Sequence, residues 1–166
     1  MGCKGASNFR LRLCVLLSCS ARLGRVAKIC QTENMILFRP VGLKELELIA
    51  QSDFKAFPPR LEIQPIFYPV LNFEYAAQIA REWNTKDPVS GFVGFVTEFE
   101  VDDEYASKFE VQIVGGARVH QDLWVPAEEL AEFNSHIVRT IKVTASFAGP
   151  DFKGKINSQT HLPDDI

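Results

Sequence analysis

The sequence predicts a compact α+β fold, because short strands and short helices follow one another without the regular alternation of a parallel α/β sheet. Its 166 residues suffice for one packed core, and a hydrophobic content of 46% is ordinary for a globular protein. The sequence contains no internal repeat and no glycine-rich phosphate loop. We expect one domain of mixed or antiparallel strands over residues 35–149, between a disordered basic leader, residues 1–34, and a disordered polar tail, residues 150–166.

The leader differs from the domain in charge and in cysteine content. The whole chain carries a net charge of -3, yet the leader is strongly basic, so the remainder carries about -8. An acidic domain is poorly suited to bind a nucleic-acid backbone, and we expect no nucleic-acid partner. All four cysteines lie in the leader at spacings that form no paired Cys-x-x-Cys clip, so we expect neither a disulfide framework nor a metal site.

Two interpretations of the leader remain open. If it is genuine, Leu16–Cys19 resembles a lipid-attachment box for export, while the basic, acid-poor composition suits an organelle transit peptide. Met1–Cys3 resembles an acylated start, although Ala6 stands where the myristoylation pattern has Ser or Thr. If translation begins at Met35, the protein is expected to be cytoplasmic. No apolar run approaches the roughly 20 residues of a membrane span, so no transmembrane segment is expected.

The domain is predicted to begin with a strand and an amphipathic helix. Ile36–Phe38 is a short apolar strand, and Arg39 should remain extended because Pro40 disfavours helix at the residue before it. Apolar residues then recur at helical spacing over Gly42–Gln51, with charged residues between them. This region therefore predicts a helix with one buried face.

A proline-rich loop, an aromatic strand and a second helix are expected next. Phe57–Arg60 contains two prolines and should form a rigid extended loop. Pro65–Val70 predicts a short aromatic strand. Asn72 is a suitable N-cap for a helix over Phe73–Trp83, whose buried stripe should include Trp83.

The second half of the domain is expected to be richer in strands. Phe92–Val101 alternates apolar and polar residues and is the clearest strand of the chain, with Glu98 and Glu100 on its solvated face. Asp102 should begin a short helical turn. The other predicted elements are three strands and one helix that has a proline in its first turn: Phe109–Val114, Val119–Val125, Ile137–Phe147 and the helix Pro126–Phe133.

Several charged and aromatic residues at the ends of these elements are candidates for a site. Asp122 opens a short apolar strand that a proline closes four residues later, and His120 shares its strand face, an arrangement suited to acid–base chemistry. Arg39 ends the first strand, Tyr68 lies in the aromatic strand, and Arg60 follows two prolines. Each of the five also has an ordinary structural interpretation as a surface, sheet-edge or packed side chain.

The order of these parts resembles the ADP-ribosyltransferase superfold. Phe38-Arg39 is similar to the Arg or His of that family's first core strand. Phe67-Tyr68, followed by Glu74-Tyr75-Ala76-Ala77-Gln78-Ile79-Ala80, resembles its aromatic strand and Tyr-Ala-x-x-x-Ala helix. Asp122-Leu123-Trp124-Val125-Pro126 resembles its late Glu-apolar-apolar-apolar-Pro strand. The resemblance covers about residues 35–147 and extends to short uncharacterised bacterial proteins labelled as ADP-ribosylation related.

The resemblance implies a domain that binds NAD or ADP-ribose, and an ADP-ribosyltransferase or NAD glycohydrolase activity with NAD as substrate. It implies that Arg39 holds a phosphate or ribose oxygen, that Tyr68 stacks on nicotinamide, and that Asp122 stabilises positive charge on the sugar. Arg60 and His120 are the further candidate ligand contacts. A small nucleotide is then the expected partner, together with a protein target for any transfer.

Two further hypotheses remain open at this point. The family pattern has Glu where this sequence has Asp122, which is one methylene shorter, so the alternative is a catalytically inactive binding or interaction module on the same fold. A register shift of one residue would place Gln121 in the cleft instead. The third hypothesis is a structural partner protein with an aromatic surface around Phe54, Phe57 and Phe67. Convergence of the candidate side chains on one cleft discriminates among these hypotheses.

Overall fold

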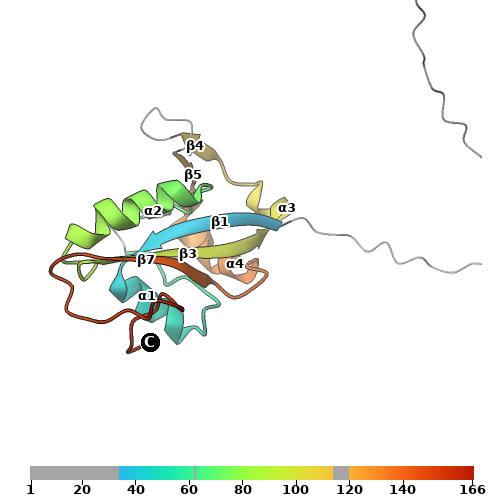
Figure 1. Ribbon diagram of the computed structural model, residues 1–166. Coiled ribbons are helices and arrows are strands. Elements are labelled where there is room, and N and C mark those ends of the chain that lie inside the picture. Colours follow the sequence, from blue (N-terminus) through green and yellow to red (C-terminus); the bar gives the residue numbers. More distant parts are fainter. Residues whose placement is uncertain (1–33, 62, 114–119) are drawn as a thin grey trace, which may run out of the picture. The chain divides into compact units, whose positions relative to one another are not determined.

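The computed structural model describes residues 34–61, 63–113 and 120–166 of the chain. Helices and antiparallel strands both contribute to the domain, which confirms the α+β class (Figure 1). The expectations for the leader up to residue 33 lie outside the described residues. Among the helices of the described ranges, none combines the length and apolar character needed to cross a bilayer.

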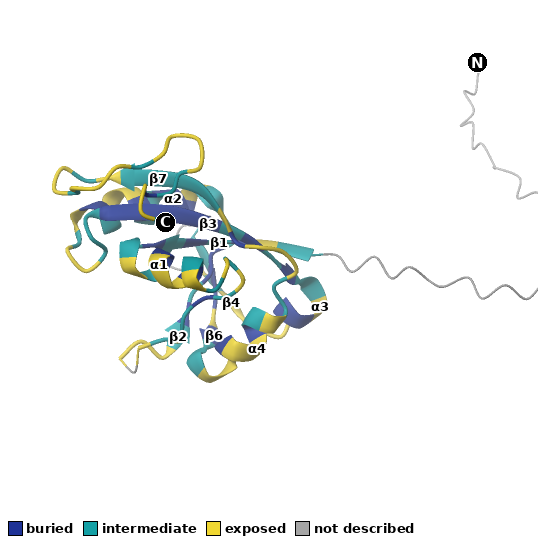
Figure 2. Cartoon of the chain, turned by 90° about the horizontal axis from the view of Figure 1, so that it is seen from below, coloured by how far each residue is buried: buried dark blue, intermediate teal, exposed yellow. Residues whose placement is uncertain are grey.

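A three-stranded antiparallel sheet forms the centre of the domain. Its strands are β1 (Asn34–Val41), β3 (Val93–Asp102) and β7 (Lys142–Ala148), with β3 in the middle. The first half of β3 is buried on both faces, as Figure 2 shows by its dark blue colour. Glu98 and Glu100 are partly exposed further along β3, as the alternation of the sequence predicts.

A single residue extends this sheet beyond β1. Val70 forms a bridge to Phe38 on one side and to Asp122 on the other. Asp122 belongs to β5 (Gln121–Leu123), which pairs with β4 (Val111–Ile113). Because directly paired residues point to the same side of a sheet, the side chains of Phe38, Val70 and Asp122 share one face.

Two helices cover opposite faces of the sheet and create two cores. α1 (Leu43–Gln51) lies over the larger core, called the α1-side core below. α2 (Phe73–Glu82) lies over the smaller one, the α2-side core, on the other side of the sheet in Figure 1. The larger core includes alternate residues of the strands: Leu37, Val41, Val93, Phe95, Phe99 and Val101. The smaller core combines intervening strand residues with the buried face of α2: Phe38, Val70, Val96, Tyr75, Ala76, Ala77 and Ala80.

A register shift lets β7 contribute to both cores. Val96 pairs with Ala145 and Thr97 pairs with Val143, so one residue of β7 is passed over between the two pairs. Val143 therefore packs in the α1-side core, while Ala145 and Phe147 pack in the α2-side core. Simple alternation along the strand predicts that Val143, Ala145 and Phe147 share one face, and this prediction is wrong because the bulge reverses the alternation.

The shorter elements complete the domain and correct several predicted boundaries. They are one two-stranded pair and four short helices: β2 (Ile66–Phe67), β6 (Val125–Pro126), η1 (Asn84–Lys86), α3 (Asp103–Ala106), η2 (Ala127–Glu129) and α4 (Leu130–Ser135). The Phe109–Val114 and Pro65–Val70 strands are shorter than expected, and β7 begins at Lys142 instead of Ile137. Pro126 pairs with Ile66, so the helix that follows begins after the proline.

The α2 helix begins where the sequence predicts but differs at its end. The Asn72 side chain accepts hydrogen bonds from the backbone nitrogens of Glu74 (2.8 Å) and Tyr75 (3.3 Å) and caps the helix. Trp83 is 59% exposed, so its predicted burial is wrong. The helix instead packs most closely through Ala80, whose backbone lies against Gly94 of β3.

The C-terminal segment is folded, contrary to the expectation of a disordered tail. Four apolar side chains of residues 150–166 pack against the α1-side core: Phe152, Ile156, Leu162 and Ile166. A bridge between Ile156 and Pro163 closes the segment on itself. These widely spaced apolar residues give a segment that is polar on average enough buried contact to be fixed on the domain.

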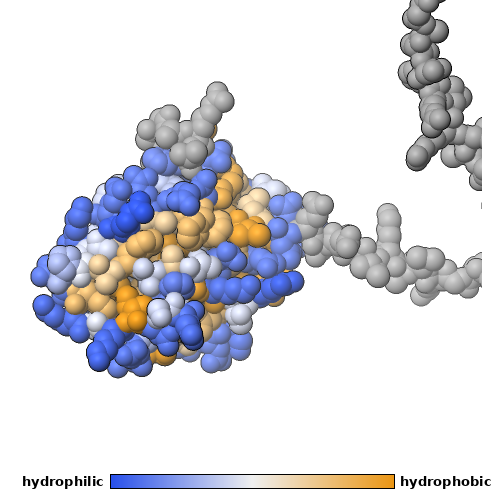
Figure 3. All heavy atoms as spheres, in the orientation of Figure 1, coloured by the Kyte–Doolittle hydropathy of each residue, from blue (hydrophilic) through white to orange (hydrophobic). Residues whose placement is uncertain are grey.

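The phenylalanines of the third hypothesis do not form a surface. Phe57 and Phe67 are buried in the α1-side core, and Phe54 packs against the same core. The rings of Phe57 and Phe67 contact each other, with 4.9 Å between their centroids, and each contacts another core aromatic ring. Apolar atoms do remain exposed in a band across the face seen in Figure 3. The proposed aromatic surface around the three phenylalanines is therefore wrong.

Candidate functional site

Three predicted site residues from distant parts of the sequence border one hollow of about 420 Å³. Arg39 comes from β1, Tyr68 from the segment after β2, and Asp122 from β5. This volume is within the range of roughly 300–1,000 Å³ that is typical of ligand pockets. The remaining lining residues are Pro40, Val70, Ile79 and Trp124. Tyr68 and Asp122 therefore meet at this hollow with Arg39 at its border, an arrangement that the bridges through Val70 create.

Asp122 is the polar residue of this hollow with the most unusual environment. It is only 9% exposed, and its Oδ1 atom is covered and accepts no hydrogen bond within the described part of the chain. Burial raises the pKa of the Asp122 carboxyl, although the positive charges of His120 and Arg39 act in the opposite direction. The pairing of Asp122 with Val70 directs the carboxyl to the face of the sheet that α2 covers. The carboxylate, and not Gln121, therefore borders the hollow.

Two aromatic side chains form an apolar wall of the hollow. The rings of Tyr68 and Trp124 meet edge to face, with centroids 5.6 Å apart and an interplanar angle of 80°. A tryptophan in a short apolar strand is most simply expected in the core, but Trp124 is 40% exposed, so this expectation is wrong. Together with Val70 and Ile79, these rings offer an apolar surface against which a flat ligand ring can pack.

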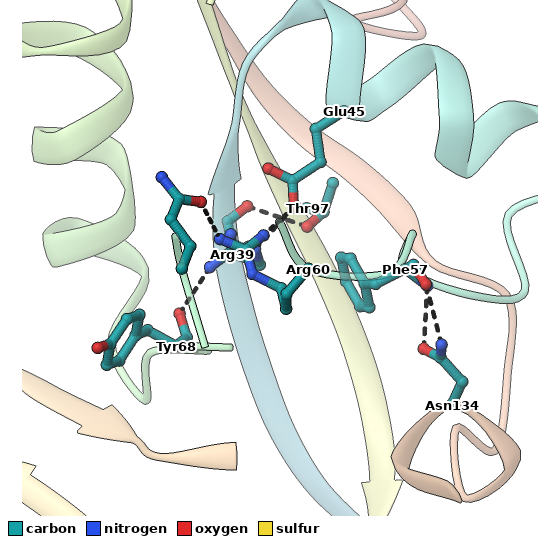
Figure 4. A network of polar contacts seen from close by, with 8 residues as sticks. Arg39, Glu45, Phe57, Arg60, Tyr68, Thr97 and Asn134 are labelled. Carbon is teal, nitrogen blue, oxygen red and sulfur yellow. Dashed lines mark hydrogen bonds and ion pairs between the residues drawn. The ribbon is translucent and has the colours of Figure 1, made fainter. Parts of the chain in front are cut away.

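Arg39 is held by contacts within the protein. Its Nε donates to Glu45 Oε1 and its Nη1 donates to the carbonyl oxygen of Tyr68, both at 3.1 Å (Figure 4). The guanidinium carbon also lies 4.7 Å from the centroid of the Phe67 ring. Arg39 follows Phe38 in β1, so its side chain leaves the sheet on the opposite face from Asp122. Its contacts fix the backbone of Tyr68 and tie β1 to α1.

A second hollow of about 380 Å³ adjoins the first and contains Arg60. Arg39, Pro40 and Tyr68 border both hollows. The Arg60 Nη2 donates to Gln64 Oε1 at 2.6 Å, while its Nη1 lies at 3.5 Å from Glu45 Oε1. Burial, and then the charge of Arg39, lower the pKa of Arg60, against the opposing effects of Glu45 and Tyr68.

A pair of hydrogen bonds positions the loop that carries Arg60. The Phe57 backbone nitrogen donates to Asn134 Oδ1, and Asn134 Nδ2 donates to the Phe57 carbonyl oxygen, both at 2.9 Å (Figure 4). Asn134 lies in α4, so this contact fixes the proline-containing loop to a distant helix. Nothing in the sequence singles out Asn134, because its partner is a backbone segment 77 residues away.

His120 lies beside the hollow, outside its lining. Its ring stacks on Tyr75 of α2, with centroids 4.2 Å apart and an interplanar angle of 17°. Tyr75 is buried, and both this burial and the Asp122 carboxylate raise the pKa of its phenol. His120 therefore acts on Asp122 electrostatically, by opposing the effect of burial on its pKa.

Glu45 is the residue of this cluster that the sequence pattern does not predict. It lies in the first turn of α1, where an acidic residue is ordinarily explained by the positive end of the helix dipole. The structure shows it between two arginines, Arg39 and Arg60, with its Oε1 close to both. The sequence signals for this cluster are the two arginines beside prolines, in Arg39-Pro40 and Pro59-Arg60.

Neither metal ligands nor a second large hollow gives the described residues a comparable site. No group of three or more potential metal-ligating side chains occurs in the ranges that the structure describes. Another hollow, of about 870 Å³, lies between α1 and the C-terminal segment, away from the predicted residues. It is bordered by charged residues of both signs, such as Glu47, Lys153 and Asp165. None of the buried unpartnered polar atoms among the described residues belongs to its lining.

Comparison with models of known protein families, with curated proteins and with solved structures gives no match for this chain. The geometry of the two adjoining hollows is therefore the basis on which a function is inferred.

Proposed function

We propose that this protein binds NAD or a ligand like ADP-ribose in the hollow bordered by Arg39, Tyr68 and Asp122. The observation that carries the proposal is the covered Asp122 carboxylate, which has an unpartnered oxygen and lies beside an aromatic wall. Buried polar groups without partners are rare in folded proteins, and such a group in a pocket points to a ligand.

The chemistry of the hollow suits the nicotinamide–ribose half of NAD. The Tyr68 and Trp124 rings provide a surface for a flat aromatic ring, and Val70 and Ile79 add apolar contact. The Asp122 carboxylate can accept hydrogen bonds from ribose hydroxyls. Arg39 keeps Tyr68 in place through its carbonyl oxygen. A ribose with an attached aromatic ring thus finds one polar and one apolar wall.

The corresponding reaction is transfer or hydrolysis at the ribose. The bond between ribose C1′ and the nicotinamide nitrogen breaks, and its electron pair remains on nicotinamide. Positive charge develops on C1′ and the ring oxygen, and a nucleophile oxygen or nitrogen then bonds to C1′ and loses a proton to solvent. An ionised Asp122 beside the ribose stabilises this positive charge. The hypothesis therefore requires the carboxylate form of Asp122.

A second candidate is a binding module on the same scaffold that does not cleave NAD. Two observations favour it: Arg39 already donates to protein acceptors, and burial favours the neutral form of Asp122. Both reduce the charge that can be offered to a reacting ligand. The two candidates share the ligand class and differ in whether nicotinamide is released.

The two tryptophans of the chain allow a direct binding test. Trp124 borders the hollow, while Trp83 is exposed at the end of α2, so a Trp83→Phe variant leaves Trp124 as the single reporter. Titration with NAD and with ADP-ribose should change the fluorescence of this variant in a saturable manner. The reciprocal Trp124→Phe variant is the matched control and should show little change. Equal responses from both variants, or none from either, would exclude binding in this hollow.

Measurement of nicotinamide release separates the two candidates. If the protein is an enzyme, the wild type releases nicotinamide from NAD, and Asp122→Asn reduces the rate by about a hundredfold or more. If it is a binding module, the wild type binds without release. Release that appears only in Asp122→Glu would show that the shorter side chain prevents catalysis, since errors of about 1 Å can cost on the order of a hundredfold in rate.

A further inference from the structure

We propose that the adjoining hollow around Arg60 is a binding subsite for a phosphate or pyrophosphate group. The identity of the complete ligand rests on the proposed function, but the anion site rests on its own charges and contacts. In this proposal Arg60 binds the phosphate, whereas the sequence resemblance implies that Arg39 holds a phosphate or ribose oxygen.

The positive and negative charges that border this hollow do not balance. The side chains of Arg39 and Arg60 are each only 10% exposed, and both guanidinium groups contact the same oxygen of Glu45. Two positive charges therefore share one negative charge where water is largely excluded. A buried charge is costly unless it is paired, and a bound oxyanion would supply the missing counter-charge.

The two arginines differ in how fully their hydrogen-bond donors are used. Arg39 makes two hydrogen bonds of 3.1 Å and packs on Phe67, so its guanidinium is firmly held. Arg60 donates to Gln64 at 2.6 Å but contacts Glu45 only at the limit of hydrogen bonding, at 3.5 Å, and its Nε atom is buried without an acceptor. Arg60 is therefore the arginine that keeps a buried donor without a partner, and a phosphate oxygen would satisfy such a donor.

The loop and the side chain of Arg60 are held in a fixed position. Prolines precede it, and the hydrogen bonds between Phe57 and Asn134 fix the start of the same loop to α4. The Arg60 guanidinium donates to Gln64 at 2.6 Å and contacts Glu45 at 3.5 Å; Figure 4 shows the Glu45 side. A side chain that is already ordered loses little conformational entropy when it binds a ligand, which favours recognition.

The hollow around Arg60 is continuous with the hollow of Asp122. The two hollows share Arg39, Pro40 and Tyr68 as their common border. A ligand with an aromatic ring and a ribose beside Asp122 would therefore extend its phosphate groups past Tyr68 towards Arg60. Together the hollows suit a phosphorylated nucleoside, in which an uncharged half and an anionic half are recognised separately.

Inorganic pyrophosphate tests the anion site without the rest of the ligand. Calorimetric titration of the full chain should show binding that weakens as salt is raised. Arg60→Gln should weaken it by about tenfold or more, since a hydrogen bond to a charged group contributes roughly 1.5–3 kcal/mol. The control Arg81→Gln alters an exposed arginine of α2 and should leave the affinity unchanged. Absence of binding, or equal affinities for all three proteins, would overturn the inference.

A second variant tests the charge argument in the opposite direction. Glu45→Gln removes the internal counter-charge and should increase pyrophosphate affinity severalfold, and it should increase the thermal stabilisation that pyrophosphate provides. This result remains decisive if Arg60→Gln fails to fold by circular dichroism. Unchanged or weaker binding to a folded Glu45→Gln protein would contradict the proposal.

The experiment also separates this inference from the proposed function. Asp122→Asn should leave pyrophosphate affinity unchanged while weakening NAD binding. Pyrophosphate binding that depends on Arg60, without any NAD binding, would support the anion site and refute the proposed ligand. NAD binding that is insensitive to Arg60→Gln, without pyrophosphate binding, would refute the anion site alone.

Discussion

Asp122 combines a structural cost with a potential role in binding. Its carboxyl is nearly covered, has one oxygen without a partner, and has a raised pKa because of that burial. A folded-state pKa above the unfolded value means that the native protein binds the proton more tightly. The stability contributed by protonated Asp122 is complete at low pH and is lost as pH rises through the folded-state pKa.

Asp122→Asn should therefore stabilise the protein at neutral pH by about 1 kcal/mol, because it removes a poorly solvated charge. Scanning calorimetry at pH 7 should show a melting temperature that is higher by a few degrees. The gain should disappear below about pH 4, where the wild-type carboxyl is neutral in both states. The exposed Asp53→Asn, whose side chain is 83% exposed, serves as the control and should show no such gain. A destabilised Asp122→Asn protein at pH 7 would refute this account.

Arg39 is predicted to stabilise the fold, whether or not a ligand is bound. Arg39→Ala leaves partly buried Glu45 with only its longer contact to Arg60 and removes the donor to Tyr68. Removal of one member of a buried ion pair typically costs about 3–5 kcal/mol, so we expect about 3 kcal/mol here. Urea denaturation should show this loss, and the double variant Arg39→Ala/Glu45→Ala should recover part of it. A loss below 1 kcal/mol would contradict the structural role.

The sequence identifies some members of the site and conceals others for physical reasons. Arg39, Tyr68 and Asp122 follow from the order of short strands, and all three border the same hollow. Glu45 and Asn134 are not predicted, because each acts through one long-range contact that leaves no local pattern. Whether these side chains bind a ligand stays a prediction.

At the scale of elements, the sequence predicts those helices whose ends depend on residues close to them in the chain. α1 and α2 are found within one or two residues of their predicted bounds, because helical spacing and the Asn72 cap are local features. The late strands are less well predicted. β7 changes faces at its bulge, and the expected strand over Val119–Val125 breaks between Leu123 and Val125, because tertiary packing overrides alternation there.

The contact between α2 and β3 gives a prediction at this scale. A methyl group at Gly94 would clash with the backbone of Ala80, which a side-chain rotation cannot relieve. Gly94→Ala should therefore push α2 outwards and cost about 2–3 kcal/mol, as overpacking does. Gly154→Ala serves as the comparison and should cost less, because the added methyl meets the end of the Phe152 side chain, which can shift where a backbone cannot. Chemical denaturation of both variants measures the difference, and equal small losses would show that α2 is loosely packed.

At the scale of the whole molecule, the described domain relies on its C-terminal segment. Residues 150–166 place four apolar side chains on the α1-side core, so they are part of the fold. The sequence does not reveal this, because the segment is polar on average and its apolar residues follow no regular period. Their positions depend on a surface that the earlier strands and α1 create.

Removal of residues 151–166 should destabilise the protein by about 3–5 kcal/mol, because each partly buried apolar side chain contributes roughly 1 kcal/mol. Thermal unfolding of the shortened chain should show a melting temperature lower by about ten degrees or more. The double variant Phe152→Ala/Ile156→Ala should produce an intermediate loss in the intact chain. A shortened chain that melts with the wild type would indicate that the segment only rests on the surface.

Val70 joins the two parts of the extended sheet through two backbone bonds to Phe38 and two bonds from neighbouring residues to β5, at distances of 2.7–3.0 Å. The pairing between β1 and β5 is therefore narrow, because these four bonds are centred on one residue. Pro40 lies on the β1 side of Val70 and Asp122 on the β5 side, and both border the hollow. A ligand that touches both sides should slow the hydrogen exchange of the amides in these four bonds, even though it makes no bond to Val70.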